Sequence, residues 1–545
     1  MNKRSAAAPA LTAAFLLVSA AWAQPASPPA LAAVETAYAD FNDAGGAISL
    51  LDSGFRDRFD GKAREAWIKA RADARAHIDA GLAELADARL SASDARALQL
   101  IRATLADADT EGSMTPAGRC ADAQAGKIEY DALREALYAC FGQLANSLEF
   151  EGAKLTRIAA FDLLTRMEEP ARRKALFHSF VPVWRAVNGE SESDSPYRRL
   201  IVMAAARARE KGSAIDAAAR TVGASTAQVE TWLTQILDTW RQVTAGTRSE
   251  PWDYRFRGGD ADRELGDAIA REALQPINER YYLDLGANLA KWDVFYDLDP
   301  RSGKAPLAYT GYVRRGRWLN GSWRPTVVQV SGNYARGGLG PLNELAHENG
   351  HVVHMMALKT RPAFMDLGDP LFYEAFADVP SWSTYEPAWQ RKYLGRSASE
   401  AASLRALYSS VMLDVAWALF ELRMLRDPTQ DPNVLWTEIT SRYLHVVPHP
   451  GLAWWAVRVQ LVHLPGYMVN YGLGAVVTAD LRQRIEERLG GFATGDVRWY
   501  PWLAQHLLAS GQERETAELL RAFLGRPVSP DALLAQLGRM KNVAE

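Results

Sequence analysis

The segment His347-Glu348-Asn349-Gly350-His351 has the pattern H-E-x-x-H, which combines two metal ligands with a proton acceptor. Residues four apart share one face of an α-helix, so His347 and His351 can both reach one Zn²⁺ at about 2.0–2.1 Å. Glu348 lies beside them, where its carboxylate can take a proton from a water molecule that the metal activates. Because this short pattern also occurs by chance in helices without metal, the interpretation depends on a third ligand.

A second acidic segment supplies that ligand. Catalytic zinc keeps three protein ligands and one open position, and Glu374 follows His351 by 23 residues, far enough for another helix to pass the first. Asp378 shares a helix face with Glu374 and is predicted to accept the free ring N–H of a ligand histidine, which fixes its tautomer. The alternative is a solvated helix edge, but neighbours such as Phe372 and Phe376 argue against full exposure.

A third group of polar side chains follows near the carboxyl end. His463, Tyr467 and Tyr471 lie at short spacing, with glycine and proline between them. Hydrolysis of an amide develops negative charge on the former carbonyl oxygen, and donors aimed at that oxygen lower the barrier by about 2.7–4 kcal/mol each. Alone, the segment is more typical of half-buried core residues; together with the zinc motif it predicts catalytic roles for all three.

The other histidines lack such neighbours. His354 lies one turn after His351 and is interpreted as a packed residue or as support for the site, because three ligands are already assigned. A structural role is expected for the remaining ones, which are His77, His178, His445, His449 and His506.

Helical periodicity dominates the rest of the chain. Apolar residues recur at three- and four-residue spacing in several long ranges, for example 64–88, 94–107, 130–148 and 226–244. Residues 260–289 show the same pattern with a break expected at Pro276. Residues 341–545 are again predominantly helical, so the motif at 347–351 falls on a predicted helix.

A small sheet is predicted just before that helix. Residues 308–313 and 326–330 have strand-like sequences, and residues 319–322 form a turn between them. An exposed sheet edge near residues 330–333 could pair with an extended peptide through main-chain hydrogen bonds. The alternative, a structural hairpin, is compatible with this hypothesis.

The first 23 residues have the features of a secretory signal peptide. Lys3 and Arg4 precede an apolar stretch that ends at the small-residue sequence Ala21-Trp22-Ala23. Removing the two cations changes the net charge from −3 to −5, which gives no electrostatic reason to expect binding to nucleic acid or to an anionic membrane. We therefore expect an exported protein, periplasmic or secreted, with residues 24–545 as one domain.

The two cysteines, Cys120 and Cys140, both lie in the exported part. An oxidising compartment permits a disulfide between them, whereas two unpaired buried thiols are the alternative.

The residues over about 290–480 resemble the helical zinc oligopeptidases, a gluzincin group. The segment 343–354 resembles the thimet oligopeptidase pattern H-E-F-G-H-x-x-H, and segment 463–471 is similar to its H-L-A-G-G-Y segment, one residue shorter here. By contrast, Phe372-Tyr-Glu-Ala-Phe-Ala-Asp-Val379 is similar to the F-H-E-A-I-G-D-V of the angiotensin-converting-enzyme family.

The two families imply different third ligands. The converting-enzyme pattern implies Glu374 with Asp378 supporting the site, whereas the thimet pattern would place Asp378 at the ligand position. We favour Glu374, since its spacing to Asp378 matches and a glutamate reaches farther. The later glutamate of the thimet family would correspond to Glu386. The converting-enzyme lysine that holds a substrate carboxylate is replaced by Leu461, so strict release of C-terminal dipeptides is not implied.

The resemblance implies a mostly α fold, with two helical lobes around a deep central cleft and one zinc on its floor. The implied substrates are short peptides, cleaved by an oligopeptidase or peptidyl-dipeptidase with Glu348 as general base. A non-catalytic exported protein that keeps the cleft for peptide binding is the alternative, and zinc-dependent hydrolysis of another amide is a third reading. The oligomeric state is not set by these patterns.

Overall fold

The computed structural model describes residues 28–112, 120, 123, 128–244, 246, 248–301, 304 and 307–542. The predicted signal peptide lies outside these residues. The described chain is mostly helical with small sheets, which confirms the predicted fold class. Within it, no helix combines the length and the apolar character needed to cross a lipid bilayer.

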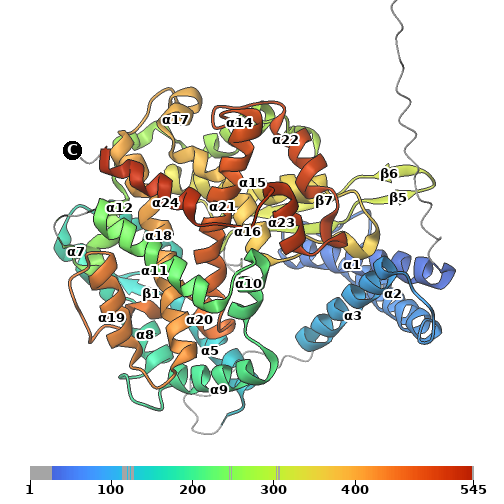
Figure 1. The fold of residues 1–545 in the computed structure, drawn as a ribbon, viewed down its shortest axis with the longest axis horizontal. Helices are drawn as coiled ribbons and strands as arrows, with labels where there is room; N and C mark the ends of the chain where they lie inside the picture. Colours follow the sequence, from blue (N-terminus) through green and yellow to red (C-terminus); the bar gives the residue numbers. More distant parts are fainter. Residues whose placement is uncertain are drawn as a thin grey trace, which may run out of the picture.

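Three helices open the described chain, and the first of them packs against both the second and the sheet (Figure 1). They are α1 (Pro29–Asp52), α2 (Arg64–Glu84) and α3 (Ala92–Gly112). Helix α1 lies so close to strand β4 (Tyr309–Arg314) that a Cβ on Gly46 would be 2.4 Å from the carbonyl oxygen of Tyr312. Glycine at this position therefore permits the contact between α1 and the sheet.

The middle of the chain is a set of mostly short helices, joined by one small hairpin. These elements are α5 (Tyr130–Ala145), β1 (Leu148–Phe150), β2 (Ala153–Leu155), α6 (Arg157–Arg166), α7 (Pro170–His178), α8 (Val181–Asn188), α9 (Pro196–Lys211), α10 (Ala214–Val222), α11 (Thr226–Val243), α12 (Tyr254–Gly258), α13 (Asp260–Leu265) and α14 (Leu274–Asp284). A disulfide joins Cys120 to Cys140 on α5, so the first of the two alternatives for the cysteines is the one observed.

The helix expected over residues 260–289 is interrupted, but not at Pro276. Helix α13 ends before Gly266, whose φ of 55° is unfavourable for most residues, and α14 begins eight residues later at Leu274. Pro276 lies in the first turn of α14, where its missing N–H has no helical partner to lose. The predicted position of the break was therefore wrong.

The main sheet has three strands in the order β3-β7-β4. Strand β7 (Val327–Ser331) is fully buried between a parallel neighbour, β3 (Asp293–Asp297), and the antiparallel β4. The two predicted strands are confirmed as β4 and β7, whereas β3 was missed. The chain between them forms a hairpin, β5 (Arg317–Leu319) and β6 (Ser322–Arg324), which turns at Asn320-Gly321 and projects from the molecule (Figure 1).

The carboxyl-terminal half returns to helices, with α15 and α16 near the centre of the molecule (Figure 1). The elements are α15 (Leu339–Ala357), α16 (Pro370–Ser381), α17 (Pro387–Leu394), α18 (Glu400–Arg426), α19 (Pro432–Tyr443), α20 (Gln460–His463), α21 (Met468–Leu489), α22 (Trp499–Leu503), α23 (Thr516–Leu524) and α24 (Asp531–Gly538). Helix α15 packs on α16, α16 on α21, and α21 on α18, around one large apolar core. This stack fixes the helix that carries the H-E-x-x-H motif.

Candidate metal centre

Helix α15 carries the motif between the sheet and α16. Its apolar face, including Leu342 and Leu345, is completely buried, and this burial holds the helix in the core. The N–H of Leu339 at its start donates to the carboxylate of Asp262 at 2.6 Å. One turn later, the Asn343 amide donates to the carbonyl of Ser381 at the end of α16, at 2.9 Å. The start of α15 is thus fixed to α13 and to the carboxyl end of α16.

The two helices approach most closely at Gly350. A Cβ there would lie 2.7 Å from the Cα and 2.8 Å from the carbonyl oxygen of Ala377, closer than atoms can pack. Glycine costs helix stability, about 1 kcal/mol relative to alanine, but here it permits direct backbone contact. This contact brings Glu374 and Asp378 of α16 over the histidines of α15.

Three potential ligands converge at this crossing. The Nε2 atoms of His347 and His351 are 3.2 Å apart, and Glu374 Oε2 lies 3.2 Å from the first and 3.9 Å from the second. Four ligands at about 2.0–2.1 Å around a tetrahedral ion are separated by about 3.3 Å, so the observed spacing fits zinc. Two imidazole nitrogens and one carboxylate are also a donor set that zinc prefers. These residues therefore fit the ion.

Asp378 orients the first ligand. One carboxylate oxygen lies 2.7 Å from His347 Nδ1, which leaves Nε2 directed at Glu374 and His351. Burial opposes protonation of His347, but the charges of Asp378 and Glu374 outweigh it and hold its pKa well above the usual value. Burial, followed by the neighbouring His347, lowers the pKa of His351 to about 3, so this imidazole keeps a free lone pair at neutral pH.

Glu348 points from the same helix towards the sheet. Its Oε2 accepts a hydrogen bond from the hydroxyl of Thr310 on β4 at 2.7 Å, and the same hydroxyl lies 3.1 Å from the Glu348 carbonyl oxygen. Burial raises the pKa of Glu348 to about 7. A carboxylate with a pKa near neutrality is well matched to accepting and returning a proton. Thr310 was not found from the sequence, although its strand was predicted.

Tyrosine side chains approach Glu374 from a third element. Tyr467 and Tyr471 are half-buried, their ring centroids are 5.7 Å apart, and both interact electrostatically with Glu374. The hydroxyl of Tyr471 also accepts a hydrogen bond from Gln460 at 3.1 Å. Tyr373, which sequence reasoning missed, packs against His351 with a centroid separation of 5.7 Å. Its position directly before Glu374 is the signal that could have identified it.

His463 has different surroundings. Its ring lies 4.2 Å from that of Tyr138 on α5, and its charge interactions are with Glu135 and Arg134. Within the described residues, these neighbours of His463 lie on α5 and none of them belongs to the ligand group. The structure thus does not bring His463 together with the two tyrosines at the ligands, and its catalytic role stays a prediction.

Three further expectations can be compared with the structure. His354 packs between Phe372 and Phe376, at centroid separations of 5.4 and 5.2 Å, as expected for a packed histidine. Glu386 pairs with Arg482 and is not part of the ligand group. Leu461 is completely buried.

Residues 330–331 are not the sheet edge that could hold a peptide, whereas pairing of a peptide with an exposed edge of this sheet stays a prediction. Strand β7 is the central strand and is paired on both sides, with β3 and β4. Its main-chain groups are therefore occupied, and only β3 or β4 could offer a free edge to an extended chain.

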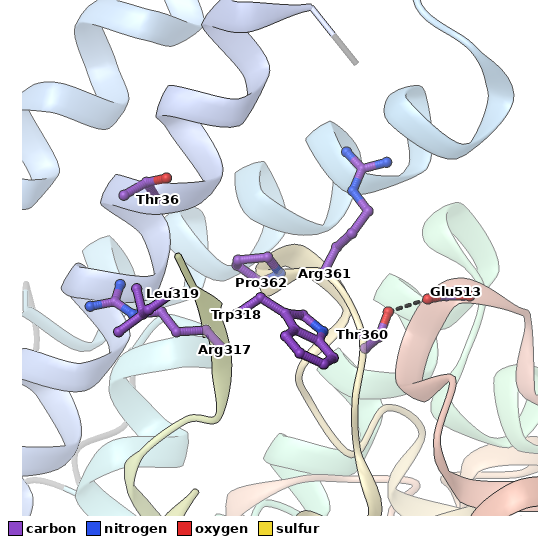
Figure 2. Close-up of a pocket in the computed structure, with 8 residues that line it drawn as sticks. All are labelled: Thr36, Arg317, Trp318, Leu319, Thr360, Arg361, Pro362 and Glu513. Carbon is purple, nitrogen blue, oxygen red and sulfur yellow. Dashed lines mark hydrogen bonds between the residues drawn. The ribbon is translucent and has the colours of Figure 1, made fainter. Parts of the chain in front are cut away.

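A separate cavity of about 460 Å³ lies between α1, the projecting hairpin and the segment after α15 (Figure 2). Its charged side chains have partners: Arg317 pairs with Asp40, Arg361 pairs with Glu35, and the Thr360 hydroxyl donates to Glu513. None of the metal-site residues lines it, so it is not part of the candidate centre.

The fold and the ligand group resemble those of helical zinc metallopeptidases. Residues 288–539, a little under half of the chain, match the model of peptidase family M3. This region contains all the candidate ligands and both tyrosines. No curated protein sequence matches the chain.

Two solved structures share the fold over nearly the whole chain. The M32 carboxypeptidase from Deinococcus radiodurans R1 is 15% identical with a TM-score of 0.57, and the alignment covers 94% of this chain and 99% of that one. PZ peptidase A, solved with an inhibitor, is 14% identical with a TM-score of 0.57, covering 93% and 96%. At these identities the similarity concerns the fold alone.

Proposed function

We propose that the protein hydrolyses peptide bonds in short peptides, with one zinc ion held by His347, His351 and Glu374. The observation that carries this proposal is the convergence of these three side chains beside the buried carboxylate of Glu348. Asp378 is assigned to the orientation of His347, because it contacts the ring nitrogen that faces away from the other ligands.

When bound, zinc polarises the scissile carbonyl group and increases the acidity of the attacking water. Glu348 takes the proton from that water and later returns it to the leaving amine. The Thr310 hydroxyl holds Glu348 Oε2, which leaves Oε1 for proton transfer. The hydroxyls of Tyr471 and Tyr467 are assigned as donors to the developing oxyanion, since both lie beside Glu374. His463 is retained as a further predicted donor.

We also propose that the protein is exported. The predicted signal peptide precedes the described residues, and the disulfide between Cys120 and Cys140 is typical of an oxidising compartment. Periplasmic or secreted localisation follows from both features, and fractionation of cells with detection of the cleaved amino terminus tests it.

The central test is Glu348→Gln. This variant keeps the shape of the side chain but removes the base, so we expect zinc content near one per chain and no products from a pool of short peptides, measured by metal analysis and mass spectrometry. Glu438→Gln is the matched control, because Glu438 is exposed on α19. Cleavage by Glu348→Gln, or wild-type cleavage after exhaustive chelation, would contradict the mechanism. Peptide binding without products from the wild type would instead favour the non-catalytic alternative.

A further inference from the structure

A buried carboxyl group, that of Glu421, lies next to the segment that carries Tyr467. Glu421 is near the carboxyl end of α18, and its side chain is completely buried. Its Oε2 accepts a hydrogen bond from the N–H of Met468 at 2.8 Å, and the N–H of Gly466 also stabilises the carboxylate. These two residues flank Tyr467 in the chain. One side chain of α18 therefore holds the main chain on both sides of the tyrosine.

The carboxyl group of Glu421 takes the place of a local helix cap. Helix α21 begins at Met468, and the first N–H groups of a helix have no partner within the helix. A serine, threonine, asparagine or aspartate just before the helix usually caps them, but here that residue is Tyr467, whose side chain makes no such bond. Glu421 supplies the acceptor from another helix, so the side chain at position 467 is free to point elsewhere.

The turn before α21 has little conformational freedom. Gly466 adopts a φ of 95°, which favours glycine. The N–H of Tyr467 donates to the carbonyl of Leu464 at 2.9 Å, which closes the turn on itself. Together with the contact to Glu421, these features fix the direction in which the tyrosine side chain leaves the main chain.

The side chain of Tyr467 connects this turn with the metal centre. It interacts with Tyr373, with Glu374 and with Tyr471. A shift of the main chain at position 467 is therefore carried to the hydroxyl that is assigned to the developing oxyanion. A displacement of about 1 Å in an active site can reduce the rate about 100-fold.

The protein keeps this carboxyl group although its surroundings disfavour a charge. Burial raises the pKa of Glu421 to about 8, against the opposite effect of the two N–H groups. The groups that interact electrostatically with it are Tyr197 on α9 and Tyr130 on α5, whose own pKa values burial raises. Within the described residues it forms no ion pair. A buried acid without a cation costs stability, so its contact with the turn at Tyr467 gives a reason for its presence.

We propose that Glu421 is a positioning residue, which sets the place of the Tyr467 hydroxyl at the metal centre by holding the main chain on both sides of this tyrosine. The inference rests on the proposed peptidase function and extends it to a residue that acts from α18, outside the ligand group. A donor to the oxyanion acts mainly in the transition state, so the loss of its position should lower kcat and leave KM nearly unchanged.

Two substitutions separate the reach of the side chain from its charge. Glu421→Asp keeps the acid but is shorter by one methylene group, about 1.5 Å, so it draws back from the N–H groups. Glu421→Gln keeps the length and a carbonyl acceptor, as in the protonated acid. With zinc-loaded protein and one short peptide at pH 7, we expect Glu421→Asp to lose about 10- to 100-fold in kcat and Glu421→Gln to stay close to the wild type.

Wild-type kcat in Glu421→Asp overturns the inference. A loss of about 10-fold or more in Glu421→Gln does the same, even if the aspartate variant does not fold. Asp480→Asn is the matched control, because Asp480 is another completely buried carboxylate, on α21, and pairs with Arg526. Loss of this pair should lower the temperature of unfolding and leave kcat unchanged.

A double-mutant cycle shows whether the effect passes through Tyr467. If it does, Glu421→Asp should lower kcat much less in the Tyr467→Phe background than in the wild type, since the hydroxyl that it displaces is already absent. The same factor in both backgrounds contradicts a positioning role and leaves only a structural one.

The wild type, given the same peptide, separates this inference from the proposed function. Cleavage by the wild type and by Glu421→Asp at equal rates contradicts only the role of Glu421. Absence of cleavage by the zinc-loaded wild type contradicts the peptidase function itself.

Discussion

Replacing Gly350 with alanine should damage the metal centre more than the stability of the protein. The added Cβ would lie 2.7 Å from the Cα of Ala377, whereas carbon atoms pack at about 3.5–4.0 Å, so α16 has to retreat by about 1 Å. Overpacking of this kind costs about 1–3 kcal/mol. The higher helix propensity of alanine offsets about 1 kcal/mol of this cost. The expected net loss in the free energy of unfolding is therefore small, about 0–2 kcal/mol.

The same 1 Å displacement acts on Glu374 and Asp378, because both lie on α16 close to Ala377. Zinc ligands tolerate errors of only about 0.2 Å, and a misplacement of about 1 Å can reduce the rate of an enzyme about 100-fold. We therefore expect Gly350→Ala to lose about 100-fold in kcat/KM and to bind zinc more weakly, while its thermal unfolding shifts by only a few degrees.

The assay compares zinc content, peptide cleavage and thermal unfolding of Gly350→Ala with those of Gly340→Ala. Gly340 lies on the same helix, but a Cβ there meets no atom within 4 Å. The control should match the wild type in all three measurements. Wild-type zinc affinity and kcat/KM in Gly350→Ala would refute the argument that direct backbone contact between α15 and α16 sets the ligand geometry.

Three further changes probe other parts of the structure. Asp378→Asn removes the acceptor at His347 Nδ1 and should weaken zinc binding about 10- to 100-fold, measured by competition with a chelator. Burial raises the pKa of Glu421 from 4.5 to about 8, so the folded protein holds this proton over a pH range in which the unfolded chain has lost it. Stability should therefore fall as the pH rises from about 4.5 to about 8, and Glu421→Gln should flatten that fall in urea unfolding compared at both ends of the range; an unchanged slope would contradict the assignment. Replacing Cys120 and Cys140 with serine should lower the free energy of unfolding by about 3 kcal/mol, since the disulfide closes a loop with a sequence separation of 20. Equal denaturation midpoints of this double variant and the wild type would show that the loop is ordered without the bond.

Local rules predicted the parts of the site that lie on single helices. The four-residue spacing of His347 and His351 places their rings together on any helix, and the spacing of Glu374 and Asp378 does the same. The helices expected from residues 64 and 226 begin at those residues in the structure. In each case the 3.6-residue periodicity and the burial of an apolar face both favour an α-helix over the same residues.

Features that depend on distant contacts were not predictable in this way. Strand β3 forms because it pairs in parallel with β7, and its short aromatic sequence carries no clear alternation. Thr310 acts on Glu348 only because β4 packs beside α15, which the order of residues does not reveal. His463 was grouped with Tyr471 by sequence proximity, yet α20 ends at His463 and its ring turns towards α5.

The contact between α1 and β4 has a consequence for how the molecule is made. Gly46 is among the first described residues to be synthesised, but the strand it fits against emerges from the ribosome only after the whole helical middle of the chain. The face of α1 that packs on β4 therefore stays uncovered until late in synthesis. Contacts between residues far apart in the sequence are also the ones that slow the folding of a protein. Under the proposed export, the native structure would close only after β4 had followed α1 across the membrane.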